Sequence, residues 1–173
     1  MTKLTFADEA KHMINIYRAA RHNSKKRFVK ATAQVEKALR YGDRAPYYSL
    51  ALALDADVKF KEGKQIREGR ARLFECNSAI GNNKDPDASY ISAHCHVWLA
   101  ISDEKVGYAQ IEAAALSANM ARKGASRFVQ SILHEFPLEV LKRVCGQRKS
   151  SPDTSDSLDG PNRVSVTKIE FDL

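Results

Sequence analysis

His94, Cys95 and His96 place three side chains of metal-ligand type in immediate succession. Imidazole and thiolate groups are the ligands that zinc prefers, so this segment could be read as part of a metal site. Neighbouring residues of a helix are about 100° apart around its axis, however, so His94 and His96 point to different sides. The other cysteines, Cys76 and Cys145, have no paired spacing. We therefore expect no metal site and no cofactor, with Cys95 buried.

Catalytic residues form no recognisable pattern in the sequence. It contains no glycine-rich phosphate loop, nucleophile elbow or H-E-x-x-H motif. Asp55 and Asp57 are two residues apart, so on a helix their carboxylates diverge and do not pair for acid–base catalysis. We expect no catalytic residues and a protein that is not an enzyme. An active site assembled from residues far apart in the sequence is the alternative that remains open.

Positive charge is concentrated in the first half of the chain. Residues 1–75 carry 17 Lys and Arg against 9 Asp and Glu, residues 76–149 carry 9 against 7, and residues 150–173 carry 2 against 5. The formal net charge of +7 therefore comes almost entirely from the first 75 residues. A one-sided positive field attracts polyanions, and nucleic acid is the commonest polyanion that a soluble protein meets.

The basic residues of this half fall on the polar sides of the predicted helices, with few acidic residues among them. The Lys25-Lys26-Arg27 run also opposes the dipole of the helix that follows it, which indicates another use, such as contact with phosphates. The predicted nucleic-acid-binding residues are Lys25, Lys26, Arg27, Lys30, Lys37, Arg40, Lys64, Arg67, Arg70 and Arg72. A solvated charged surface and a binding face for an acidic protein are the two alternatives.

No known nucleic-acid-binding module accompanies these residues. The sequence lacks zinc-finger spacing, an aromatic RNA-binding signature and a basic region followed by heptads. We therefore expect recognition of backbone or shape, without a choice between RNA and DNA. Tyr48 is a candidate to stack on a base, whereas Tyr47 falls on the apolar side of its helix.

Apolar residues recur at helical spacing over most of residues 5–146. This pattern predicts an all-α fold of seven or eight antiparallel helices, arranged as stacked helical hairpins or as a bundle. The predicted starts at Thr5, Ala45, Asp85 and Ala125 are about 40 residues apart, which is in the range of two-helix repeats. No residue signature recurs at equivalent positions, so plain antiparallel helices are the preferred explanation.

The apolar stripes predict which face of each helix is buried. The first helix is expected to bury Phe6, Ala10, Met13, Tyr17 and Ala20, and the sixth is expected to bury Val106, Ala109, Ala113, Leu116 and Met120. Ser24 and Asp103 are expected to cap the second and sixth helices. The fifth helix is apolar nearly all round from Tyr90 to Ile101, so we expect it to be the most buried.

The composition changes abruptly after the helical domain, residues 1–146. Residues 147–163 are rich in Ser, Asp, Pro and Gly, which predicts a flexible linker. Residues 164–173 regain apolar side chains and predict a short extended segment. Because exposing those side chains to water is unfavourable, we expect the segment to dock on its own helices or on a protein partner, self-association included. A frayed terminus is the alternative.

Three further observations limit the class of protein to which this chain could belong. No apolar run approaches the ~20 residues of a membrane span, so no membrane partner is expected. The first residues do not resemble a secretory signal, and three widely spaced cysteines fit reduced thiols in a cytoplasmic protein. The leading prediction is a non-enzymatic nucleic-acid-binding protein. The alternative is a helical protein–protein interaction module, such as an adaptor, an inhibitor or a small subunit of a larger assembly.

Overall fold

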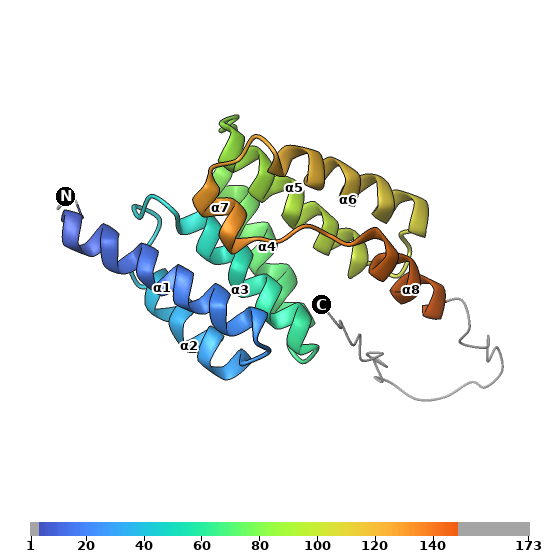
Figure 1. Ribbon diagram of the computed structural model, residues 1–173, viewed down its shortest axis with the longest axis horizontal. Helices are drawn as coiled ribbons and strands as arrows, with labels where there is room; N and C mark the ends of the chain where they lie inside the picture. Colours follow the sequence, from blue (N-terminus) through green and yellow to red (C-terminus); the bar gives the residue numbers. More distant parts are fainter. Residues whose placement is uncertain (1–3, 149–173) are drawn as a thin grey trace.

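A computed structural model describes residues 4–148 of the chain (Figure 1). Over this range the regular structure is entirely helical. The helices are α1 (Phe6–Ser24), α2 (Phe28–Leu39), α3 (Tyr48–Glu62), α4 (Ile66–Ile80), α5 (Pro86–Ile101), α6 (Tyr108–Arg122), α7 (Arg127–Ile132) and α8 (Leu138–Arg148). The predicted all-α fold is confirmed.

Three antiparallel hairpins, α1–α2, α3–α4 and α5–α6, stack on one another in chain order (Figure 1). Between hairpins, α2 packs against α3 and α4 packs against α5, while α3 also contacts α1 and α5. The hairpins begin at Phe6, Tyr48 and Pro86, which keeps the predicted interval of about 40 residues. The spacing of the helix starts therefore does correspond to a repeated structural unit.

The second helix of each hairpin buries the same three positions, i, i+4 and i+7. The residues are Ala31, Val35 and Ala38 in α2, Gly69, Leu73 and Cys76 in α4, and Ile111, Ala115 and Ala118 in α6. This spacing keeps three side chains on one helical face. A Cβ atom at Gly69 would lie 3.2 Å from Phe60 Cε2, so α3 and α4 approach closely there. The three hairpins therefore repeat the positions that are buried but not the residue types at those positions. This explains why no residue signature recurs in the sequence.

The most buried helix is α3, and the prediction that assigned this place to the fifth helix is wrong. Every residue from 50 to 60 is buried, because α1, α2, α4 and α5 all pack against α3. Three of these residues, Asp55, Asp57 and Lys59, are charged. They lower the mean hydropathy of the helix, so its hydropathy pattern does not indicate that it is buried. Partners compensate their charges: Lys59 Nζ, for example, lies 2.8 Å from Asp55 Oδ1.

The predicted buried face of α1 is wrong in part. Phe6 is 86 % exposed and Tyr17 is 52 % exposed, whereas His12 is completely buried. His12 fits in the core because its Nδ1 lies 3.0 Å from the carbonyl oxygen of Ala38, on α2. A polar residue can be buried when tertiary structure supplies a hydrogen-bond partner, and the sequence of one helix does not show that partner.

The predicted buried face of α6 is also wrong. The helix packs through Ile111, Ala115 and Ala118, and much of the predicted stripe faces solvent. The exposed residues of that stripe are Ala109, Ala113, Leu116 and Met120. Alanines lie on several sides of α6, so its own periodicity does not select a face. Packing against α5 and α8 makes the selection.

The predicted helix starts at Thr5 and Asp85 are confirmed, and each of these residues is the N-cap of its helix. Thr5 forms a capping box at α1, and the Asp85 carboxylate accepts a hydrogen bond at the start of α5. The predicted cap at Asp103 is wrong, because α6 begins only at Tyr108. Asp103 accepts instead from the backbone N–H of Lys105, within the turn.

The chain after α6 turns back and crosses in front of α3 and α5 (Figure 1). There α7 is followed by an extended segment, residues 133–137, which leads into α8. Tyr90 Oη donates to the carbonyl oxygens of Leu133 at 2.9 Å and His134 at 3.2 Å. The Asn119 amide exchanges two hydrogen bonds of 3.0 Å with the backbone of Phe136. These contacts fix the extended segment on the stack.

The predicted linker, residues 147–163, begins inside α8, which continues to Arg148. The rest of that linker and the predicted extended segment, residues 164–173, lie outside the described residues, as does the predicted docking of that segment. Among the helices of residues 4–148, none has the length and apolar character needed to cross a membrane.

Candidate anion-binding surface

Four exposed cations meet at the turn between α1 and α2. Lys25, Lys26, Arg27 and Lys30 form this group, which we call the basic turn. Lys25 is the C-cap of α1 and Arg27 is the N-cap of α2. Between them, Lys26 has a φ of 55°, a left-handed conformation that is unfavourable for a residue with a Cβ atom. The turn is tight and brings these side chains to one end of the first hairpin.

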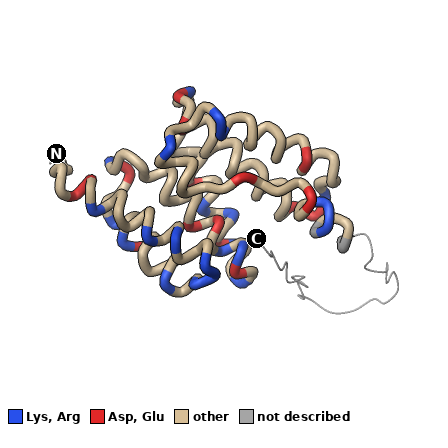
Figure 2. Tube along the Cα trace, in the orientation of Figure 1, with Lys and Arg blue, Asp and Glu red and all other residues tan. Residues whose placement is uncertain are grey.

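Acidic residues are absent from the chain between Glu9 and Glu36, a stretch that contains seven Lys and Arg residues. In Figure 2 the colour of Lys and Arg recurs along α1, α2 and the turn that joins them. Partial desolvation lowers the pKa of His22, and the positive charges of Arg21 and of three members of the basic turn lower it further. His22 therefore lies in a region of positive potential.

Among the described residues, ion pairs leave most of the charge of the basic turn uncompensated. Within residues 4–148, no ion pair is formed by Lys25, Arg27 or Lys30. Unpaired, exposed cations keep their charge available to an anionic partner.

The N-terminus of α2 lies inside the basic turn. The expected cap, Ser24, belongs to α1, where its Oγ donates to the carbonyl oxygen of Arg21 at 3.0 Å. Arg27 takes the N-cap position without a side-chain hydrogen bond, and the first turn of α2 holds no acidic residue. The positive end of the helix dipole and the basic side chains therefore add to each other, a combination that favours anions.

Four more predicted residues are exposed, at two places on the molecule. Lys37 and Arg40 lie towards the other end of α2 from the basic turn, while Lys64 and Arg67 lie at the turn between α3 and α4. Lys64 Nζ is 3.5 Å from a Glu62 carboxylate oxygen, an exposed pair of little energetic weight. These residues extend the basic surface over the first two hairpins.

Arg70 and Arg72 instead hold the fold together. Arg70 donates to two oxygen atoms at the C-terminal end of α5. Arg72 Nε lies 3.0 Å from Asp55 Oδ2, and its Nη1 lies 2.7 Å from Glu75 Oε2. Glu75 also accepts a hydrogen bond from Tyr48, which together with desolvation raises the pKa of Tyr48 to about 12. These side chains are engaged, so their interpretation as nucleic-acid contacts loses support.

Asp57 is the centre of a buried network that the sequence reasoning missed. Its carboxylate accepts hydrogen bonds from Asn23 Nδ2 at 2.6 Å and Trp98 Nε1 at 3.0 Å, and it lies 3.0 Å from Lys61 Nζ. His94 Nε2 is 3.6 Å from the same carboxylate. Burial by itself raises the pKa of Asp57, but Lys61 and His94 outweigh this effect and bring the pKa below its usual range. The network joins α1, α3 and α5.

A cleft of about 520 Å³ opens beside the basic turn. Its lining comes from four parts of the chain: Asn23, Ser24, Lys26 and Phe28 of the first hairpin, Lys61 of α3, Arg122 of α6, and His134, Glu135 and Pro137 of the extended segment. Pockets for small molecules have volumes of roughly 300–1,000 Å³. No sequence signal pointed to this cleft, because its residues are distant along the chain.

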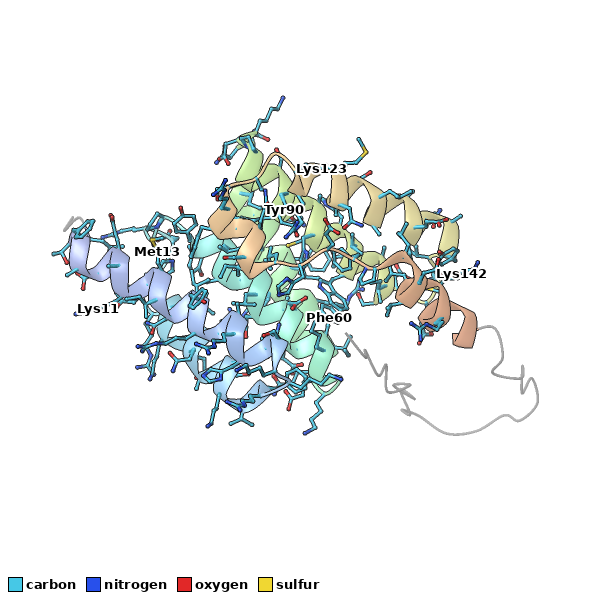
Figure 3. All side chains as sticks on the ribbon, in the orientation of Figure 1. Lys11, Met13, Phe60, Tyr90, Lys123 and Lys142 are labelled. Atoms are coloured by element: carbon cyan, nitrogen blue, oxygen red, sulfur yellow. The ribbon has the colours of Figure 1, made fainter. Side chains whose placement is uncertain are left out.

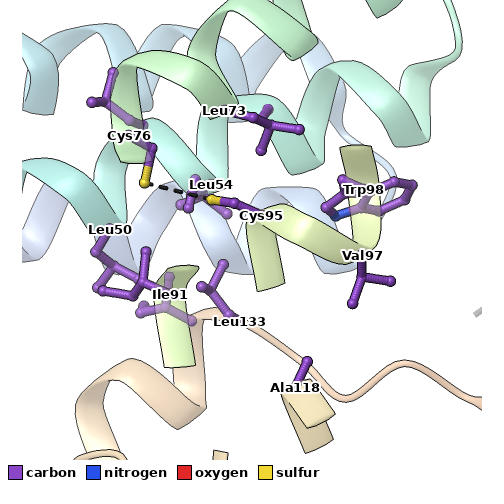
Figure 4. Packing of buried hydrophobic residues seen from close by; sticks show 14 of the residues in the cluster. Leu50, Leu54, Leu73, Cys76, Ile91, Cys95, Val97, Trp98, Ala118 and Leu133 are labelled. Carbon is purple, nitrogen blue, oxygen red and sulfur yellow. Dashed lines mark hydrogen bonds between the residues drawn. The ribbon is translucent and has the colours of Figure 1, made fainter. Parts of the chain in front are cut away.

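His94, Cys95 and His96 diverge, as their adjacency on a helix predicts. His94 faces the Asp57 network, His96 is exposed, and Cys95 is buried with its Sγ 3.5 Å from Cys76 Sγ (Figure 4). Within residues 4–148, no group of three or more His, Cys, Asp and Glu side chains could hold a metal ion.

No protein-family model matches the chain, and the comparisons with curated proteins and with solved structures gave no match. The functional argument therefore rests on the side chains and their geometry.

Proposed function

We propose that this is a non-enzymatic nucleic-acid-binding protein. The basic turn would contact the phosphate backbone, together with the exposed cations Lys37, Arg40, Lys64 and Arg67. The observation that carries the proposal is the first hairpin itself, where seven Lys and Arg residues occur with no acidic residue between Glu9 and Glu36. Neutralising several phosphates releases counterions from the nucleic acid, and that release drives binding.

The local energetics of the basic turn support this proposal. Like charges at Lys25, Lys26 and Arg27 repel one another, and Arg27 lies at the positive end of the α2 dipole, whereas Lys25 lies at the favourable C-terminal end of α1. Lys30 and Lys37 extend the charge along α2, where seven residues span about 10 Å. An anionic backbone that follows this path would relieve the repulsion.

Contacts to phosphates determine what the proposed surface can recognise in a nucleic acid. Lysine and arginine side chains that meet phosphates read backbone and shape, so RNA and DNA both fit the surface. The three cysteines are buried and form no disulfide among the described residues, which fits a reducing compartment such as the cytoplasm.

Fluorescence anisotropy with a labelled single strand and a duplex of the same sequence tests the proposal. In a variant carrying Lys25→Glu, Arg27→Glu and Lys30→Glu, we expect weaker binding at low salt. The slope of log affinity against log salt should fall by about 1 for each lost phosphate contact.

The matched control carries Lys105→Glu, Lys123→Glu and Lys142→Glu, which change the net charge equally at exposed positions. Figure 3 shows that Lys123 and Lys142 lie away from α1 and α2. The control should keep the salt slope of the wild type. Absent binding at low salt, or equal losses in the two variants, would overturn the proposed function.

A second candidate function, a helical interaction module, is favoured by the exposed face of α6. Ala109, Ala113, Leu116 and Met120 recur at helical spacing on that face, with Leu116 47 % and Met120 71 % exposed. An apolar stripe of this kind fits the groove of a partner protein or a second helix.

Pull-down from native extract, with and without nuclease, separates the two candidate functions. A partner retained after nuclease treatment and lost in the Leu116→Glu, Met120→Glu variant would favour the interaction module. Phe74→Glu is the control, because Phe74 is 56 % exposed on α4, outside both proposed surfaces. Loss of every captured protein on nuclease treatment would count against this second candidate.

A further inference from the structure

The 520 Å³ cleft combines features of an anion site with features of a small-molecule site. Its cations, Lys26, Lys61 and Arg122, come from three separate elements and converge on one cavity. One acidic residue, Glu135, also lines it and lies 3.3 Å from Arg122 Nη1. The lining therefore carries more positive than negative charge.

Lys61 and Arg122 are held in place by the fold. Lys61 is anchored by the buried carboxylate of Asp57 at 3.0 Å. Arg122 Nη2 donates to the carbonyl oxygen of Gln130 at 3.0 Å, while its Nε has no hydrogen-bond partner among the described residues. Cations fixed before a ligand arrives lose less conformational entropy on binding.

The third cation lies at the N-terminus of α2. Lys26 and Phe28, which flank the N-cap of that helix, both line the cleft. The first turn of α2 has no side-chain cap, so its backbone N–H groups and the helix dipole remain available to a phosphate. The left-handed φ of Lys26 is strained, and backbone strain of this kind clusters at functional sites.

A buried polar side chain beside α2 is only half satisfied. Asn23 is 4 % exposed and lines the cleft. Its Nδ2 donates to Asp57, whereas its Oδ1 has no partner among the described residues. A buried acceptor without a partner is costly, so this unsatisfied group beside the cleft marks a locally unfavourable arrangement.

The remaining walls include apolar side chains. Phe28 of α2 and Pro137 of the extended segment both contribute apolar surface to the cleft, and His134 also lines it. Desolvation and the charge of Lys61 lower the pKa of His134, so its imidazole is neutral at pH 7 and adds little to the charge of the lining.

We propose that the cleft binds a nucleotide, with its phosphate at Lys26, Lys61 and the N-terminus of α2 and its base against Phe28 and Pro137. The ligand would be either a free nucleotide or the 5′-phosphorylated end of a nucleic-acid strand. The second source rests on the proposed function, since the basic turn would then hold the rest of the strand.

Isothermal titration calorimetry of the full chain with adenosine monophosphate, and with adenosine as the phosphate-free control, tests the cleft. We expect one site per chain and at least about tenfold weaker binding of adenosine, since several charged hydrogen bonds are lost. Lys26→Gly should weaken nucleotide binding by about tenfold while removing backbone strain, so it should fold. Lys123→Gln is the matched control, because Lys123 is exposed next to Arg122 and carries the same charge without lining the cleft.

Anisotropy with 5′-phosphorylated and 5′-hydroxyl oligonucleotides distinguishes the two sources of the ligand. Tighter binding of the 5′-phosphorylated oligonucleotide, with this preference lost in Lys26→Gly, would identify the ligand as the end of a strand. Equal binding of the two oligonucleotides, together with binding of adenosine monophosphate in the cleft, would identify the ligand as a free nucleotide. Oligonucleotide binding without a nucleotide site, or equal effects of Lys26→Gly and Lys123→Gln on nucleotide binding, would contradict the nucleotide site and leave the proposed function standing. Binding of adenosine monophosphate by a protein that binds no oligonucleotide would support the nucleotide site in the cleft and overturn the proposed function.

Discussion

The amide of Asn23 donates a hydrogen bond of 2.6 Å to the carboxylate of Asp57, joining the last turn of α1 to α3. Both residues are at least 95 % buried. Because the same carboxylate binds Lys61 and Trp98, it links the three hairpins through α1, α3 and α5. It also fixes two residues of the cleft, Asn23 and Lys61.

Asp57→Ala should lower the free energy of unfolding by about 3–5 kcal/mol, because it leaves the half-buried Lys61 without its counter-charge and the buried donors of Asn23 and Trp98 without their acceptor. Urea denaturation followed by circular dichroism gives this quantity. Asp43→Ala removes an exposed carboxylate and serves as the control, with an expected change within about 0.5 kcal/mol. Similar stabilities for the two variants would mean that the Asp57 network is not a principal support of the fold.

Asp57 also predicts a pH dependence of stability. Its folded-state pKa lies below that of an unfolded aspartate, about 3.9, so the unfolded chain binds the proton first as the pH falls. Its contribution is fully present above about pH 4 and is lost as the pH drops through the folded-state pKa. Denaturation of the wild type between pH 5 and pH 2 should therefore show a steeper loss than Asp57→Ala. Parallel curves for the two proteins would contradict this prediction.

Lys26→Gly should raise the melting temperature. Glycine adopts the observed φ of 55° without the cost of about 1–2 kcal/mol that a Cβ atom incurs there, and the change also removes one of several repelling charges. Differential scanning calorimetry measures the shift. Lys25→Gly is the comparison, since Lys25 has a φ of −96° and gains nothing from glycine. A fall in melting temperature for Lys26→Gly would show that its side chain stabilises the turn.

Phe136→Ala should destabilise the protein by about 3–5 kcal/mol, because it removes a buried ring that anchors the extended segment. The ring centroid of Phe136 lies 4.7 Å from that of His94 and 5.8 Å from that of Trp98. The fluorescence of Trp98, the only tryptophan, should change as well. Phe74→Ala, at a residue 56 % exposed, should leave both stability and fluorescence nearly unchanged. An unaltered spectrum of Phe136→Ala would argue against this packing.

Local signals in the sequence located most helix boundaries. Thr5 and Asp85 cap helices, and Gly63 and Gly81 end them with positive φ, because each of these residues acts within a few positions of itself. The divergence of Asp55 and Asp57 was predictable for the same reason, since it follows from helix geometry alone. The start of α6 could not be predicted from Asp103, because the carboxylate of a turn residue can accept a hydrogen bond within its own turn.

The sequence by itself determined the all-α fold, the interval between hairpins and the basic character of the first half, since these depend on residue type and local spacing. Tertiary structure alone decided which face of α6 is buried and whether a cation is exposed, like Lys30, or engaged, like Arg72. The Asp57 network and the cleft joining Lys26 to Arg122 also exist only in three dimensions. The physical reason is that a polar group is stabilised by the partner it meets in space, and that partner comes from a distant part of the chain.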